Sequence, residues 1–321
     1  MADGSLYHVD SAKPVRKIAL AKATKKTLED DGLHRLEKIK KLAIVAMFSE
    51  DELLKHLVLK GGNALDLIHK ISTRASVDID FSMKTDFPGG RAKFRGLVEK
   101  ALVETYQGDG YHVFDVTMEE KPDQLSPEVA GFWGGYWVEF KLIESSRYPT
   151  FKDDIEGLRR NAVNLGRGTK FLVDISKYEY TEGKEARDFE GYRIFVYSAQ
   201  MMVCEKLRAI CQQMPEYGPI VKRGRPGSPR ARDFVDIHAL VGLFNIDVST
   251  RSNLELVTNI FAAKRVPLSF LRQIEKHRDF HRAAFPAVEA TVKVGVKLER
   301  FDVYFDFVLG LVGKLKPLWD V

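Results

Sequence analysis

The stretch LKGGNALDLIHKISTRASVDIDF, residues 59–81, decides the fold that this sequence predicts. It joins a short apolar strand, a Gly-Gly turn and a helix to a second strand that carries two carboxylates. Successive side chains of a strand point to opposite faces, so Asp78 and Asp80 share one face while the apolar residues around them pack on the other. Two carboxylates therefore converge at one point.

This carboxylate pair favours a metal site. Two like charges about 4 Å apart repel by roughly 4 kcal/mol at an effective dielectric constant near 20, so a fold keeps them only with some offsetting interaction. Mg²⁺ uses few protein carboxylates and completes its coordination with water and substrate phosphate oxygens. We therefore expect Asp78 and Asp80 to bind one or two Mg²⁺ ions beside a phosphate-bearing substrate.

The residues before the pair suit that substrate. Gly61 and Gly62 lack a Cβ atom, so backbone can approach a phosphate closely. Asn63 is expected to open the helix over residues 64–70, whose first amides point free N–H groups at an anion. The spacing predicts a triphosphate-binding turn next to the metal site.

Each part also has an ordinary structural explanation. An Asp-x-Asp pair alone is typical of a solvated loop or a Ca²⁺-binding turn, and Gly-Gly alone is typical of a turn. Arg74 and Ser76 either add to the nucleotide site or form a polar connection from helix to strand. The order strand, turn, helix and Asp-x-Asp strand favours the phosphate site.

Three later segments extend the pattern: Phe171–Ser176 (FLVDIS), Glu205–Ile210 (EKLRAI) and Arg232–Leu240 (RDFVDIHAL). With them, the chain resembles the AbiEii/AbiGii toxin-like nucleotidyltransferases, including the MenT-type toxins, of the DNA polymerase beta-like superfamily. The matching motifs run in order from about residue 58 to 240. The resemblance implies an α/β (α+β) nucleotidyltransferase fold, a small mixed sheet flanked by helices, with a C-terminal helical lobe.

The resemblance also assigns roles to single residues. It implies that Asp78, Asp80 and Asp174 hold the metal. It further implies that Lys206 contacts the nucleotide phosphates and that Asp233 is needed for transfer.

The residues themselves leave alternatives. Asp174 lies in an apolar strand, where a carboxylate is costly unless it faces a cation or a polar cleft, although an edge strand facing water would also accept it. Glu139 is a rival third carboxylate, and a solvated strand face explains it equally well. Lys206 lies beside an apolar helical stripe, where a lysine commonly extends to solvent. Asp233 suits a helix N-terminus as a capping carboxylate.

Two departures from the family pattern stand out. Asn63 replaces the Thr or Ser that is common in relatives, so an amide stands where a hydroxyl contact to phosphate is expected. The basic Gly/Pro-rich segment EYGPIVKRGRPGSPR, residues 216–230, is inserted between two motifs. We expect it to be flexible, and it is either an electrostatic guide for a polyanion or a solvated connector.

Composition agrees with a folded enzyme. The chain has 321 residues, a formal net charge of +5 and two cysteines, Cys204 and Cys211, which are expected to be reduced core thiols. The mild charge permits RNA binding without requiring it. No apolar run is long and uncharged enough to cross a bilayer, and no signal peptide is recognised, so we expect a cytoplasmic protein. The pair His277 and His281 lacks the other ligands of a zinc site.

Periodicity predicts two parts: residues 1–200, a catalytic lobe with an N-terminal helical segment, and residues 201–321, a helical lobe that completes the cleft. The first is expected to contain a helix from residue 32, a helix over 91–106 and strands near 112–118 and 135–143. From residue 199 onward the patterns are helical.

The function that follows is a Mg²⁺-dependent nucleotidyltransferase, which moves a nucleoside monophosphate from an NTP to an acceptor hydroxyl and releases pyrophosphate. The resemblance further implies the toxin of a type IV toxin–antitoxin or abortive-infection system, with tRNA as acceptor and an antitoxin encoded nearby. Two alternatives stay open. One is an enzyme that modifies a protein or a small molecule, and the other is a non-catalytic binding protein with the same fold.

Overall fold

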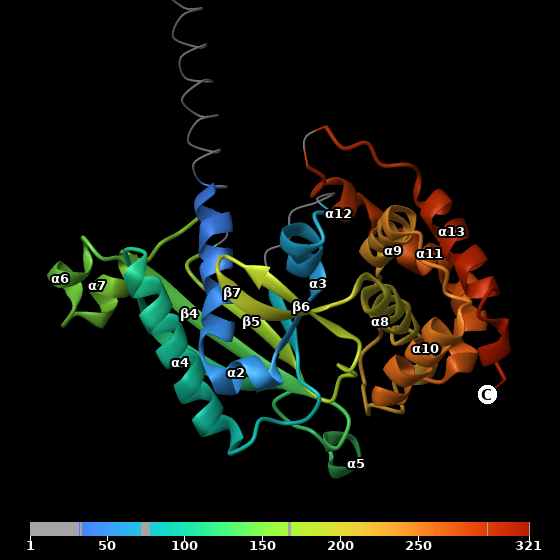
Figure 1. The fold of residues 1–321 in the computed structure, drawn as a ribbon, viewed down its shortest axis with the longest axis horizontal. Helices are drawn as coiled ribbons and strands as arrows, with labels where there is room; N and C mark the ends of the chain where they lie inside the picture. The colour runs from blue at the N-terminus through green and yellow to red at the C-terminus, as the bar shows by residue number, and fades with distance from the viewer. Residues whose placement is uncertain (1–31, 33, 72–77, 166–167, 294, 321) are drawn as a thin grey trace, which may run out of the picture.

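A computed structural model describes residues 32, 34–71, 78–165, 168–293 and 295–320. These residues form a mixed β-sheet flanked by helices, with a helical part packed beside it (Figure 1). The predicted α/β fold class is confirmed. Strands give way to helices at the start of α8 (Ala199–Cys211).

The described residues hold one seven-stranded sheet with the order β3-β4-β5-β2-β1-β7-β6. Two neighbouring pairs are parallel, β2 with β5 and β1 with β7, and the others are antiparallel. The strands are β1 (Val58–Lys60), β2 (Ile79–Ser82), β3 (Tyr111–Lys121), β4 (Gly135–Glu144), β5 (Phe171–Ser176), β6 (Lys184–Phe189) and β7 (Tyr192–Tyr197).

One face of the β3–β4–β5 region is covered by α4 (Gly90–Gly108) and the helix over residues 34–49. Helix α4 buries Phe94, Val98 and Leu102, which share one side because they are four residues apart. Strand β4 alternates buried and more exposed residues, as expected for a strand with one covered face. The Tyr106 hydroxyl donates to the Ile39 carbonyl at 2.6 Å and joins the two helices.

The remaining helices divide at the last strand. Those before it are α2 (Asp51–His56), α3 (Gly61–Asn63) with a π-helical turn (Ala64–Ile68), α5 (Pro127–Ala130), α6 (Tyr148–Phe151) and α7 (Ile155–Arg160). Those after it are α8, α9 (Ala231–Phe244), α10 (Arg251–Ala263), the 3₁₀ segment Leu268–His277, α11 (Arg278–Arg282), α12 (Phe285–Glu289) and α13 (Phe301–Gly313). None of these described helices combines the length and the apolarity that a membrane crossing needs.

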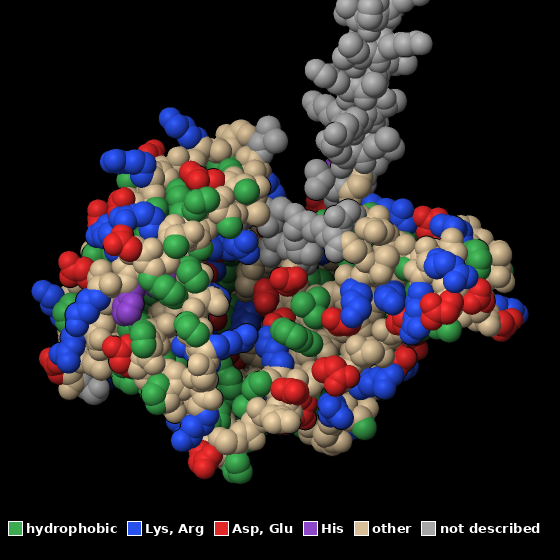
Figure 2. Space-filling model, turned by 180° about the vertical axis from the view of Figure 1, so that it is seen from behind, with side chains coloured by type: hydrophobic (Ala, Val, Ile, Leu, Met, Phe, Trp, Pro, Cys, Tyr) green, Lys and Arg blue, Asp and Glu red, His purple; other side chains and the backbone are tan. Residues whose placement is uncertain are grey.

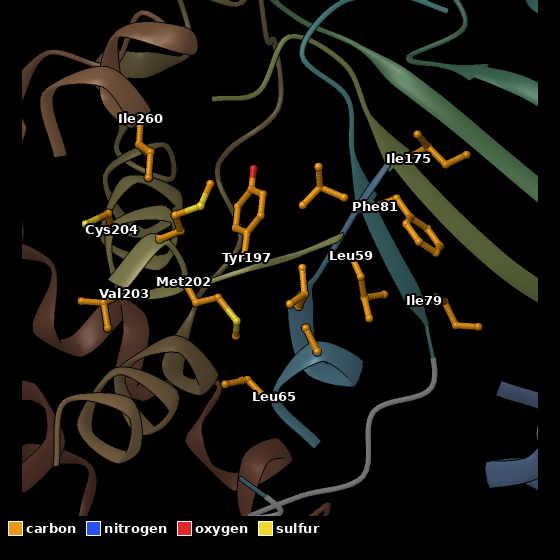
Figure 3. Packing of buried hydrophobic residues seen from close by; sticks show 14 of the residues in the cluster. Leu59, Leu65, Ile79, Phe81, Ile175, Tyr197, Met202, Val203, Cys204 and Ile260 are labelled. Atoms are coloured by element: carbon orange, nitrogen blue, oxygen red, sulfur yellow. The ribbon is translucent and has the colours of Figure 1, made fainter. Parts of the chain in front are cut away.

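A continuous core joins the sheet to the helical part. Tyr197 and Met202 lie between the strand residues Leu59 and Phe81 and the helix residue Val203 (Figure 3). All five side chains are buried. Cys204 and Cys211 are buried free thiols on α8, as the sequence predicted. The helical part is therefore fixed to the strands that carry the site.

One local prediction is wrong, and one hairpin was not predicted. The helix after the Gly-Gly turn begins at Gly61 rather than at Ala64, because Gly61 adopts a φ of 70° and turns the chain directly out of β1. Asn63 therefore lies inside the helix and does not cap it. The sequence analysis also passed over the β6–β7 hairpin, whose turn is made by Glu190 and Gly191, both with positive φ.

Candidate active site

A single row of side chains crosses the middle of the sheet on the face opposite the core. The pairing of the strands sets the order of this row. It consists of Lys60 on β1, Asp80 on β2, Asp174 on β5 and Trp137 on β4. The neighbours Leu59, Phe81 and Ile175 point the other way, into the core (Figure 3). Burial of these apolar neighbours therefore fixes which way the row faces.

A cleft of about 450 Å³ lies over this row. Its walls come from the sheet, from the Gly-Gly turn and from the helical part, and Figure 2 shows basic and acidic side chains gathered in the hollow between the two parts. Among the predicted site residues, the cleft brings together Gly61, Gly62, Asp78, Asp80, Asp174, Lys206 and Asp233.

Gly61 makes room for the central carboxylate. A Cβ atom at this position would lie 2.1 Å from Oδ2 of Asp80, and the φ of 70° also disfavours any larger residue. The first glycine of the turn is therefore needed for the close approach of Asp80 to the backbone. This reason differs from the phosphate contact that the sequence suggested.

The surroundings of Asp80 disfavour its charged form. Burial, together with the neighbouring Asp174 and Asp78, raises its pKa to about 7, although Lys60 opposes the shift. Negative charge therefore exceeds the positive charge that the protein supplies at this point. A bound cation would relieve the excess.

Asp174 is held by two donors from neighbouring strands. Lys121 forms an ion pair with its Oδ2, and the Trp137 Nε1–H donates to the same oxygen at 3.2 Å. The Lys121 ammonium also lies 5.3 Å from the centroid of the Trp137 ring. Lys121 therefore supplies the positive charge next to Asp174, where a bound metal ion could take its place.

On the opposite wall, Lys206 of α8 is buried between two carboxylates of α9. Its Nζ donates to Asp233 at 2.9 Å and to Asp236 at 2.8 Å. Burial alone would lower the pKa of Lys206, but the two carboxylates outweigh it and raise that pKa above its usual value. Lys206 is therefore a fixed cation.

Arg230 completes this wall just before α9. Its Nε donates to Asp233 Oδ2 at 2.5 Å, and its backbone N–H donates to Nδ1 of the buried His281 at 3.0 Å. Burial would raise the pKa of Asp233, but Arg230 and Lys206 hold it well below its usual value. His281, which the sequence analysis set aside, therefore fixes the backbone that presents Arg230 to the cleft.

Behind the row, a buried ion cluster links the sheet to the helical part. Glu179 lies 3.5 Å from Lys60, 3.1 Å from Arg208 and 3.6 Å from Lys264. Burial would raise the pKa of Glu179, but these three cations lower it to about 2. Lys60 therefore contacts Glu179 on one side and faces the cleft on the other.

Comparison with known proteins decides the family. The family model described as "Nucleotidyl transferase AbiEii toxin, Type IV TA system" matches residues 43–306, most of the chain. The chain belongs to this AbiEii family. It is a nucleotidyltransferase, and the resemblance that the sequence motifs predicted is confirmed. Membership implies an NTP substrate and an antitoxin partner.

Three solved structures show some similarity to this AbiEii member. A candidate nucleotidyltransferase from H. pylori is 18% identical, with a TM-score of 0.46, over 88% of this chain and 96% of that one. JHP933 from Helicobacter pylori is also 18% identical, with a TM-score of 0.46, over 89% and 94%. An antigenic nucleotidyltransferase-like protein from Paracoccidioides brasiliensis is 13% identical, with a TM-score of 0.32, over 70% and 92%. Among the curated proteins, none matches this sequence.

Some predicted residues of this AbiEii chain lie elsewhere than expected. Asp78 is exposed at a bend just before β2, so it does not share the regular strand geometry of Asp80. Asn63 is buried, and its side-chain amide donates to the Asp78 carbonyl at 2.6 Å rather than facing the cleft. Arg74 and Ser76 lie outside the described residues.

Glu139, the rival third carboxylate, is not among the residues that line the cleft. It forms an ion pair with Lys170, and its cross-strand partner is Leu172 rather than Asp174. Across the parts of the chain that the structure describes, no three acidic, His or Cys side chains are arranged as a ready metal site. The carboxylates at the cleft floor are the in-register pair Asp80 and Asp174, with Asp78 at the edge.

The inserted basic loop is packed against the end of α8 rather than standing free. Arg223 donates to the Gln212 carbonyl at 3.1 Å, and the Ser228 amide donates to Gln213 Oε1 at 2.9 Å. Gly227 lies so close to Gln213 that a Cβ atom would be 2.1 Å from its carbonyl oxygen. The composition predicted a flexible loop, but these contacts hold it in place.

Several residues at the cleft are not among the site residues that the motifs predicted. Lys60 and Lys121 line the cleft, and Trp137 lies beside Asp174 at its margin. All three are placed there by strand pairing, which no local sequence pattern specifies. Arg230 had a weak signal, because it precedes the Arg-Asp motif by two residues. It was assigned to the loop instead of the site.

Proposed function

We propose that this protein transfers a nucleoside monophosphate from an NTP to a hydroxyl of tRNA and releases pyrophosphate. One observation carries the proposal. Asp80 and Asp174 lie in register on neighbouring parallel strands, at the floor of a cleft whose opposite wall holds two fixed cations, Lys206 and Arg230. Carboxylates that face cations across a cleft suit a substrate with a phosphate chain and a metal ion.

The donor set is suited to Mg²⁺. The ion prefers oxygen ligands and needs only one or two carboxylates from the protein, and the raised pKa of Asp80 indicates negative charge without sufficient compensation. Asp80 and Asp174 would hold the ion, or two ions, with Asp78 as a third carboxylate. Bound Mg²⁺ would neutralise phosphate charge and lower the pKa of the attacking hydroxyl.

The cations on the opposite wall bind and orient the triphosphate. Two of the three ammonium protons of Lys206 bond Asp233 and Asp236, which leaves the third for a phosphate oxygen. Asp233 accepts from both Lys206 and Arg230, so its role is to position these two cations relative to the substrate. Such positioning and electrostatic stabilisation supply most of the rate in phosphoryl-group transfer.

The acceptor and the biological setting rest on the family. An AbiEii toxin of a type IV system implies an antitoxin, and we propose tRNA as the acceptor, in the cytoplasm where NTPs and Mg²⁺ are available. The basic residues Arg230 and Arg232 line the cleft beside the inserted loop. They add positive charge at the edge where a polyanion would enter.

The test is transfer of label from each α-labelled NTP, with Mg²⁺, onto total RNA and total protein, by the wild type and by Asp80→Asn. We expect label on tRNA with one preferred NTP, and a loss of roughly 10²- to 10³-fold in the variant, since an essential electrostatic contact is removed. The variant should keep the wild-type circular dichroism spectrum.

Other outcomes contradict parts of the proposal. Label on protein would replace tRNA by a side-chain acceptor, and no label on any acceptor would favour a binding protein. Full activity of a folded Asp80→Asn variant would contradict the assignment of Asp80 as a metal ligand.

A further inference from the structure

Trp137 is an aromatic residue left uncovered on β4, the strand next to the β3 edge of the sheet. Its side chain is 46% exposed, while the adjacent β4 residues Tyr136 and Val138 are buried on the other face. A large exposed indole on an inner strand is unusual, and it lies directly opposite Asp174 in the register of the sheet. Its Nε1–H donates to Asp174, so the ring has a fixed place beside the site.

The order of the strands separates Trp137 from Lys60 and from the Gly-Gly turn. Lys60 lies on β1, on one side of the Asp80–Asp174 pair, and Trp137 lies on β4, on the other side. The Gly-Gly turn, which follows β1, also lies on the Lys60 side. A triphosphate bound there would direct its leaving pyrophosphate away from Trp137.

In-line displacement then locates the acceptor. The attacking oxygen approaches from the side opposite the leaving group. With pyrophosphate on the β1 side, the acceptor hydroxyl enters over Asp174, on the β4 side, where Trp137 is the large exposed surface.

We propose that Trp137 and Lys121 form the subsite for the end of a nucleic-acid acceptor. The terminal base stacks on the indole, and Lys121, which now pairs with Asp174, turns to a phosphate of the acceptor. A cation bound at Asp174 competes with Lys121 for the same oxygen, so it frees the ammonium for this contact. The inference rests on the proposed transfer reaction and deepens it by defining the acceptor class.

The charges around the ring limit the size of this subsite. Glu119 lies opposite Trp137 on β3, and Glu139 lies two residues along β4 on the same face, paired with Lys170. Glu119 disfavours a long run of phosphates here, whereas the charge of Glu139 is offset by Lys170. The subsite therefore takes one terminal nucleotide, whose base has a π face and no charge.

Binding of a 5′-fluorescein ribohexamer with a free 3′ hydroxyl, followed by anisotropy in EDTA without NTP, tests the stack directly. Trp137→Ala should weaken binding by roughly 5- to 150-fold, the range of one base–aromatic stack. Trp137→Phe keeps a stacking ring and should stay within about threefold of the wild type. The matched control is Tyr192→Ala, an aromatic residue of similar exposure, 44%, on β7, which should not change binding.

The same hexamer with an abasic 3′-terminal residue should bind the wild type as weakly as the intact hexamer binds Trp137→Ala. Equal affinity of the wild type and Trp137→Ala would overturn the inference, as would wild-type affinity for the abasic hexamer. Thermal melting of each variant establishes that it is folded before binding is compared.

Steady-state transfer separates this inference from the proposed function. Trp137→Ala should raise KM for the RNA acceptor and leave KM for the NTP unchanged. If the wild type labels RNA and the variant keeps the wild-type KM for RNA, the subsite fails and the transfer reaction stands. If the wild type labels protein instead, both the tRNA assignment and the nucleic-acid subsite fail.

Discussion

Two carboxylates beside Lys60 have opposite surroundings. Asp80, on the cleft floor, has its pKa raised to about 7 by burial and by Asp174. Glu179, behind the row, has its pKa lowered to about 2, because Arg208, Lys264 and Lys60 outweigh the effect of burial. The protein fully compensates the charge of Glu179, which joins its two parts. It leaves excess negative charge around Asp80, where a ligand is expected to bind.

Removal of Glu179, the compensated carboxylate, should have the largest effect on the free energy of unfolding. Glu179→Gln leaves three cations buried without their shared anion, and breaking a buried ion pair costs about 3–5 kcal/mol. We expect a loss of this size in the free energy of unfolding, measured by urea denaturation. Glu182→Gln, which removes an exposed carboxylate paired with Lys84, is the control and should leave the unfolding midpoint unchanged. A stable Glu179→Gln protein would show that the cluster does not hold the two parts together.

Displacement of Asp80, the uncompensated carboxylate, by Gly61→Ala should have an intermediate effect on stability. In Gly61→Ala, the new methyl group collides with Asp80 and the backbone retains an unfavourable positive φ, which costs roughly 1–2 kcal/mol before the collision is counted. A shift of about 1 Å in a catalytic group can reduce kcat/KM about 10²-fold, which label transfer would measure.

The control for this change is Gly96→Ala on α4, where a Cβ atom meets no neighbour. It should be neutral or stabilising by up to about 1 kcal/mol. Wild-type transfer by a folded Gly61→Ala variant would contradict the close packing of the turn against Asp80.

Neutralisation of Asp80, the uncompensated carboxylate, should have the smallest effect on stability. It should stabilise the fold, whereas the other two changes destabilise it. The pKa of Asp80 is about 7 in the folded protein and about 3.9 in the unfolded chain, so ionisation destabilises the fold as the pH rises from 4 to 7. Asp80→Asn removes this cost. In EDTA at pH 8 its Tm should exceed that of the wild type, by roughly 1–2 °C for each kcal/mol of relieved cost in a chain of this size.

The Tm difference should shrink as the pH falls towards 4, because Asp80 is then protonated in the folded protein and becomes protonated in the unfolded chain too. Thermal melts of the wild type and Asp80→Asn across this range measure it. Asp153→Asn, an exposed carboxylate before α7, serves as the control and should show no such trend. A difference that is constant with pH would rule out ionisation of Asp80 as its cause.

The sequence predicted those parts of the molecule that local patterns specify. The segment FLVDIS matches β5 to the residue, because its apolar side chains and bounded length are typical of a buried strand. The motifs also identified Asp80, Asp174, Lys206 and Asp233, all of which line one cleft. These residues belong to runs whose spacing is recognisable without any knowledge of the sheet.

The rest depends on pairing between distant strands. Lys121 and Trp137 lie beside Asp174 only because β3, β4 and β5 are neighbours in a particular register, which no local pattern specifies. The β6–β7 hairpin was missed because KEARDF is mostly polar and lacks the alternation of a half-buried strand. Asn63 was misplaced because a glycine with positive φ began the helix earlier than capping rules indicate.

The parallel pairing of β2 with β5, and the ion pairs of Lys206 with α9, also set an order of assembly during synthesis. Asp80 leaves the ribosome long before Asp174 can pair beside it, and Lys206 has no counter-ion until Asp233 and Asp236 follow. A nascent or prematurely terminated chain that ends before α9 lacks the wall that holds the phosphate-binding cations. His281, which fixes Arg230, and Val288, which lines the cleft, come later still, so the cell that makes this toxin-family protein is exposed to a complete site only from chains that have passed α12.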